Sequence, residues 1–178
     1  MIAHRKNAGF SMIEVLITIV ILMIGLLGLA GLQTKALTAQ MEAYQRSQAL
    51  ILLKDMVDRI SANRKNALSY VTELNPAASC PAAGATVASV DLNEWCNALL
   101  GAAEVQDTAK VGAMIGARGC ITQTIAPVTG VPSQYLVAVA WQGLNSTAIP
   151  AITCGQNQYG NEALRRVVAL PVTIADLL

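Results

Sequence analysis

Few side chains in this sequence have the types and spacing that catalysis or metal binding requires. The chain has 178 residues and a single histidine, His4, close to its N-terminus. Catalytic bases and metal sites that need imidazole could draw on no other residue. The acidic residues Glu94, Glu104 and Asp107 follow no spacing that marks a catalytic pair. We therefore interpret them as surface charge and expect neither an enzyme active site nor a cofactor.

The sequence gives equally little indication of a site for phosphate or nucleic acid. Gly112, Gly116 and Gly119 follow no clear strand and lack the Lys-Ser/Thr pair of a phosphate-binding loop. The formal net charge is only +1. Adjacent side chains on a strand face opposite ways, so Arg165 and Arg166 do not form one basic patch. Salt bridges are the favoured role of these two arginines, and nucleic acid is an unsupported partner.

The most prominent feature is an apolar segment near the N-terminus. The chain is 54% hydrophobic and 13% charged, whereas soluble domains carry about 25% charged residues. No charged residue lies between Glu14 and Lys35, and residues 12–32 are long enough for a helix that crosses a bilayer. The basic residues 4–6 precede it, so we predict a single span with a cytoplasmic N-terminus and a periplasmic C-terminal part. A cleaved secretory signal and a plain signal anchor are the alternatives.

Glu14 is unexpected in such a segment, because a carboxylate near the membrane centre costs about 2.5–3.5 kcal/mol, and less towards the interface. It stands four residues after Phe10, which follows Gly9 and a short basic leader. This order resembles the processing site of type IV prepilins. The resemblance implies that a prepilin peptidase cuts between Gly9 and Phe10, removes residues 1–9 and methylates the new amine of Phe10. It also implies that Glu14 pairs with this amine during filament assembly.

Three glycines, Gly25, Gly28 and Gly31, recur at intervals of three within the apolar segment. Small residues allow close helix–helix contact in membranes, and each glycine weakens a helix by about 1 kcal/mol relative to alanine. Close packing and local melting during assembly are both open interpretations. The stretch 24–33 resembles one subgroup of minor pilins, the PilV-type or type IV pilus modification proteins.

The helical pattern continues beyond the apolar segment. No proline occurs before Pro76 and no glycine lies between Gly31 and that proline, so we predict one helix over residues 10–64. An apolar stripe at helical spacing is expected to pack against the C-terminal domain. The residues of this stripe are Leu50, Leu53, Met56, Val57 and Ile60. Residues 65–75 are predicted as a linker.

A small α+β domain is predicted over residues 76–178. Asp91 and Glu94 have the spacing of a reciprocal helix cap, which predicts a short helix over 92–103. Alternating patterns predict strands at 120–125, 135–141 and 165–170, with Trp95 and Trp141 in the core and Pro171 favouring an edge or a bulge. Short connections favour an antiparallel sheet. By the resemblance, a long helix packed on this sheet is the type IV pilin fold.

The four cysteines all lie in the part predicted to face the oxidising periplasm. Three pairings are open from the sequence. We favour Cys80–Cys96 and Cys120–Cys154, which are local links that do not cross. A zinc site is a weak alternative, because the sequence contains no C-x-x-C motif.

The resemblance implies a minor pilin of the PilV type that takes part in initiating pilus assembly at the tip, and hence in adhesion, twitching motility or DNA uptake. Its expected partners are other minor pilins, the major pilin, the prepilin peptidase and the inner membrane, without a small-molecule substrate. A pseudopilin of a type II secretion system is the main alternative, since it shares the N-terminal motif. A membrane-tethered periplasmic enzyme is a remote one.

Overall fold

A computed structural model describes residues 10–101, 105–106, 109–110 and 114–175. The chain divides into two compact units, Met1–Met41 and Glu42–Leu178, and each is considered by itself. The helices are α1 (Met12–Ala62), η1 (Arg64–Tyr70), α2 (Val87–Leu99) and η2 (Glu162–Leu164). The strands are β1 (Thr72–Leu74), β2 (Val105–Gln106), β3 (Ala109–Lys110), β4 (Ile115–Ile125), β5 (Ser133–Gln142) and β6 (Arg165–Ile174).

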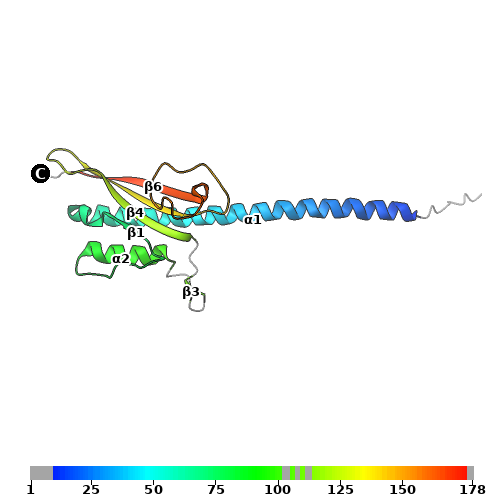
Figure 1. Ribbon diagram of the computed structural model, residues 1–178, viewed down its shortest axis with the longest axis horizontal. Helices are drawn as coiled ribbons and strands as arrows, with labels where there is room; N and C mark the ends of the chain where they lie inside the picture. The colour runs from blue at the N-terminus through cyan, green and yellow to red at the C-terminus, as the bar shows by residue number, and fades with distance from the viewer. Residues whose placement is uncertain (1–9, 102–104, 107–108, 111–113, 176–178) are drawn as a thin grey trace, which may run out of the picture. The chain divides into compact units, whose positions relative to one another are not determined.

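The predicted fold class is confirmed. Four strands form an antiparallel sheet in the order β1-β4-β5-β6, while β2 and β3 pair separately. In the second unit, α2 and the sheet lie against the last turns of α1 (Figure 1). β6 is an edge strand, which accommodates Pro171 because a proline lacks the N–H that an inner strand would use.

Helix α1 buries one face of its last five turns. Its buried residues are Gln45, Ala49, Leu53, Met56 and Ile60, which recur every three or four positions and so share one face. The stripe predicted from the sequence began at Leu50, but Leu50 is 44% exposed. Adjacent residues differ by about 100° around a helix, so burial of Ala49 turns Leu50 towards the surface.

The sheet covers this face of α1 with alternate residues of its strands. Ile121, Val137, Val139 and Trp141 are buried in the same core as the α1 stripe. Trp95 joins them from α2, and its indole Nε1 donates a hydrogen bond to the Leu52 carbonyl oxygen at 2.9 Å. The prediction that Trp95 and Trp141 belong to the core is therefore confirmed.

Gly119 of β4 is required by the same contact. A Cβ atom at this position would lie 2.4 Å from Cζ3 of Trp95, closer than real Cβ contacts. The indole ring therefore packs directly on the strand backbone, and the glycine serves close packing between α2 and the sheet.

The predicted start of the short helix is wrong. Thr86 is the N-cap of α2, and its side chain and that of Ser89 form the reciprocal capping box, so the helix covers 87–99 rather than 92–103. Asp91 lies inside the helix instead of at its start. A hydroxyl pair can cap a helix as well as a carboxylate pair, and the sequence contains both spacings.

The stretch 65–75, predicted as a linker, contains most of η1 and the strand β1. β1 pairs only Thr72–Leu74 with Ile121, Cys120 and Gly119 of β4. Three residues show almost no alternation of apolar and polar side chains, so the sequence pattern did not predict this strand. The predicted strands 120–125, 135–141 and 165–170 lie within β4, β5 and β6, respectively. The observed strands extend beyond the predicted ranges.

The segment between β5 and β6 covers the outer face of the sheet. Cys154 and Tyr159 pack there against Cys120, Ala138 and Ala140, so both faces of β5 are buried rather than one. A Cys120–Cys154 disulfide holds this segment to β4. A Cys80–Cys96 disulfide holds the loop between β1 and α2 to α2 itself. Among the described residues no cysteine is free.

The buried side chain of Arg165 also holds the segment between β5 and β6 in place. Its side chain is 1% exposed and donates to Oε2 of Glu162 at 2.7 Å. It also donates to the carbonyl oxygens of Pro150 and Cys154, each at 3.1 Å, and to that of Ile152. The planar guanidinium suits this arrangement because its five N–H groups diverge in a fixed fork.

We expect Arg165→Leu to lower the free energy of unfolding by about 3 kcal/mol or more, because the change leaves buried carbonyl oxygens and Glu162 without their donor. Thermal unfolding of the detergent-solubilised chain, followed by circular dichroism, measures the loss. Arg46→Leu is the control, since Arg46 is exposed on α1. Equal stability of the two variants would contradict the assignment.

Candidate functional site

The first unit presents the residues predicted to direct processing and assembly. Phe10 precedes α1 and is 84% exposed, and Glu14 lies in the first helical turn with its backbone N–H donating to Ser11. Glu14 forms no ion pair with another described residue. Gly9, the other half of the predicted cleavage site, lies outside the described residues.

Helix α1 is long and apolar enough to cross a membrane, and its most apolar part is not buried by other described residues. The large apolar residues from Phe10 to Leu32 are all exposed. Exposed surface of this extent is incompatible with water as its permanent solvent, because apolar area costs about 25 cal/mol per Å² to hydrate. The segment therefore needs lipid or other helices around it.

The three glycines of this segment sit on an unbroken helix. An added Cβ at Gly25, Gly28 or Gly31 would meet nothing within 4 Å. Nothing in the isolated chain therefore requires glycine at these positions. Both interpretations, close packing against another helix and melting during assembly, remain predictions that concern other molecules or another state.

In the second unit, Glu42 joins α1 to the segment that follows β5. Its Oε1 accepts from the backbone N–H groups of Leu144 (3.0 Å) and Asn145 (2.9 Å) and from Nη2 of Arg166 (3.3 Å). Burial works to raise the pKa of Glu42, but the Asn145 N–H and the Arg166 charge outweigh it and lower the pKa below its ordinary value. Glu42 is the first residue of the second unit.

A second network joins α1 to α2 through Arg59. The guanidinium donates to Asp55 at 3.0 Å, to Asp91 at 2.8 Å and to Glu94 at 2.6 Å. Burial works to lower the pKa of Arg59, but its hydrogen bonds to Glu94 and Asp91 outweigh this effect and raise it. Asp91 also accepts a hydrogen bond from the hydroxyl of Tyr70. Burial is the larger cause and this hydrogen bond the next, and together they raise the pKa of Tyr70 to about 12.

These networks account for most of the charged residues considered as catalytic or ligand-binding. Glu94 pairs with Arg59, Arg165 with Glu162 and Arg166 with Glu42, so the predicted structural role of the two adjacent arginines is confirmed. Glu104, Asp107 and Gly112 lie outside the described residues. Among the residues that the structure does describe, no group of three or more His, Cys, Asp or Glu could hold a metal ion.

Sequence reasoning missed Glu42 and Arg59 as individual sites. Their partners stand up to 124 positions away along the chain. A single sequence carries no signal that would pair residues so far apart.

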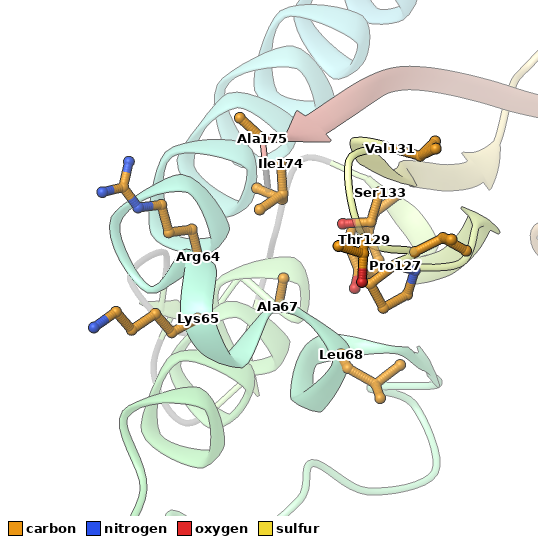
Figure 2. A pocket seen from close by; sticks show the side chains of 12 residues that line it. Arg64, Lys65, Ala67, Leu68, Pro127, Thr129, Val131, Ser133, Ile174 and Ala175 are labelled. Carbon is orange, nitrogen blue, oxygen red and sulfur yellow. The ribbon is translucent and has the colours of Figure 1, made fainter. Parts of the chain in front are cut away.

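A groove of about 540 Å³ lies between η1 and the hairpin that joins β4 to β5. Leu68 and Val128 contribute exposed apolar side chains to it. Figure 2 shows that the charged ends of Arg64 and Lys65 point away from the hairpin residues Pro127 and Thr129. The groove is therefore walled mainly by apolar and hydroxyl groups and has no cation directed into it.

We expect Glu42→Gln to reduce the loss of stability on acidification. Because the pKa of Glu42 is lower in the folded state than its ordinary value of 4.5, its contribution is present above that value and is lost as the pH falls through the folded-state pKa. Denaturant unfolding of the detergent-solubilised chain between neutral pH and about pH 3 measures this.

Asp58→Asn is the matched control for this measurement, since Asp58 pairs with Lys54 only at the exposed surface of α1. A Glu42→Gln profile parallel to that of Asp58→Asn at every pH would contradict the assignment.

Comparison with protein families gives two matches that adjoin along the chain. The model of the prokaryotic N-terminal methylation motif matches residues 4–30, and the Tt1218-like model, described as type IV pilin Tt1218, matches residues 31–100. The first covers the predicted cleavage site and most of the apolar segment. The second covers the rest of α1, η1, β1 and α2.

Comparison with curated proteins and with solved structures gives no match. The assignment therefore depends on the two family models and on the fold. The first model covers the motif that resembles a prepilin processing site, and the long apolar helix with its four-stranded antiparallel sheet agrees with both models. The chain is a type IV pilin.

Proposed function

We propose that this pilin is a minor pilin of the type IV pilus, of the PilV type, which takes part in initiating filament assembly at the pilus tip. Adhesion, twitching motility or DNA uptake would then depend on it indirectly. The resemblance of residues 24–33 to the PilV-type subgroup supports the finer assignment. Its role is structural: it is a substrate of the prepilin peptidase rather than an enzyme.

The observation that carries the proposal is the uncovered apolar half of α1 with one carboxylate in it. The segment from Met12 to Leu32 has no partner within the described chain that would bury it. A filament in which such segments pack side by side would bury this surface without lipid. Glu14 is the feature that a purely lipid-anchored helix does not need, since it raises the cost of insertion.

Cleavage between Gly9 and Phe10 would supply the partner for Glu14. The cut creates a free amine at Phe10, which is cationic at neutral pH. In the apolar interior of a filament, the Glu14 carboxylate and this amine, on the same or a neighbouring subunit, would neutralise each other. Loss of one member of a buried ion pair costs about 3–5 kcal/mol because the other is left uncompensated.

We further propose that the chain is held in the inner membrane by this helix before assembly, with residues beyond Leu32 in the periplasm. Basic residues 4–6 favour a cytoplasmic N-terminus. The two disulfides of the second unit suit an oxidising compartment. Other minor pilins and the major pilin are the proposed partners in the filament.

A pseudopilin of a type II secretion system is the second candidate, because the N-terminal methylation motif is common to both classes. Deletion of the gene separates the two functions. Loss of surface pili and of twitching with normal protein secretion would support the minor pilin, and the reverse outcome would support the pseudopilin.

We expect Glu14→Ala to be cleaved and inserted normally but to enter filaments poorly, with incorporation reduced about tenfold or more. The reason is the uncompensated Phe10 amine, for which a loss of 1.4 kcal/mol already corresponds to a factor of ten. Immunoblots of membranes and of sheared pili measure the two pools.

Thr18→Ala is the matched control for Glu14→Ala. Thr18 lies one turn further along α1, and its hydroxyl donates only to the Val15 carbonyl oxygen of its own helix. Normal incorporation of Glu14→Ala, or equal loss in both variants, would refute the role of the carboxylate.

A further inference from the structure

A second cavity of about 350 Å³ opens on the outer face of the sheet and is not used by the proposed function. β1, β4 and β5 form its floor, and the loop residues Ile152–Cys154 form one wall. The lining is predominantly apolar, including Leu136, Ala138 and Ile152. The hydroxyl-bearing residues Thr122 and Thr153 complete it, and the backbone of Thr72 borders it.

The loop wall of this cavity is held rigidly. The Cys120–Cys154 disulfide ties it to β4, and the buried Arg165 donates to the carbonyl oxygens of Ile152 and Cys154 from below. A ligand that enters would therefore not have to order the wall, which is the property that makes small apolar cavities effective binding sites.

Glu73 gives the cavity its charge. It lies on β1, lines the cavity and is exposed. The other described carboxylates of the second unit all form ion pairs, namely Glu42, Asp55, Asp58, Asp91, Glu94 and Glu162. Glu73 forms none with a described residue. Arg118, on the adjacent strand, donates to Gln158 at 2.9 Å instead.

We propose that this cavity binds an alkyl cation, specifically the side chain of an arginine or lysine from a neighbouring pilus subunit. The apolar walls suit the methylene stem of such a side chain, and Glu73 at the cavity suits its charged end. A neutral apolar side chain would leave Glu73 uncompensated, and an acidic one would be repelled. The subunit source rests on the proposed function, whereas the cavity's preference for an alkyl cation does not.

Titration of the full-length chain in detergent micelles tests the preference directly. The probes are N-acetyl-arginine methylamide and its neutral isostere, N-acetyl-citrulline methylamide, and the readout is backbone amide chemical shifts. We expect the arginine probe to shift Thr72, Thr122 and Thr153 and to bind at least about fivefold more tightly than the citrulline probe. Equal binding of the two probes, no binding, or shifts confined to other regions would overturn the proposal.

Three variants sharpen the result. Glu73→Gln should lower the affinity for the arginine probe to that for the citrulline probe, and Thr122→Trp should block both by filling the cavity from an exposed position. Asp58→Asn, which changes an exposed carboxylate on α1, should bind like the unaltered chain. Unchanged binding in Glu73→Gln would refute the role of the carboxylate.

The subunit source is tested separately in cells, with a photoreactive phenylalanine in place of Thr122. We expect crosslinked peptides from sheared pili to come from another subunit and to contain lysine or arginine next to the crosslink. Crosslinks that lack a basic residue, or that form only within this chain, would refute the subunit source. Absence of the chain from pili would refute the proposed function, and the titration would still decide the cavity's preference.

Discussion

One helix has to satisfy two different surroundings, and the organisation of this protein depends on that constraint. From Met12 to Leu32, α1 exposes apolar side chains on every side, whereas from Gln45 to Ile60 it buries a single face. An all-round apolar helix needs lipid or other helices, and a one-sided helix needs a domain to cover its stripe. The sheet and α2 supply that cover, so the globular unit forms around the second half of α1 only.

The globular unit is secured at its margins by charge as well as by packing. Glu42 holds the segment after β5 to the start of the packed part of α1. Near the end of α1, Arg59 holds α2 through ion pairs with Asp91 and Glu94. Buried Arg165 and the Cys120–Cys154 disulfide then fasten the outer face of the sheet. The other described carboxylates of this unit form ion pairs, whereas Glu73 forms none with a described residue. In the first unit, Glu14 is likewise without an ion pair among the described residues.

The two unpaired carboxylates lie in surroundings that differ in kind. Glu14 lies in an apolar helical segment that no other described residue covers. Glu73 sits beside a preformed apolar cavity on a stable sheet. Neither carboxylate forms an ion pair with another described residue.

The sequence by itself predicted the apolar segment, the continuous helix and three of the four sheet strands, because each depends on local periodicity. The resemblance of its N-terminal motif to that of prepilins indicated the family, since the residues of that motif lie close together in the chain. It misplaced the start of α2, since two capping spacings compete within six residues and only packing selects Thr86 over Asp91. β1 was too short to show alternation.

The tertiary structure decided that Ala49 rather than Leu50 belongs to the buried face of α1, and why β4 has a glycine under Trp95. It also brought Glu42, Arg59 and Arg165 into ion pairs and left Glu73 without one among the described residues. Those outcomes arise from contacts between residues far apart in the chain, and only folding brings such residues together.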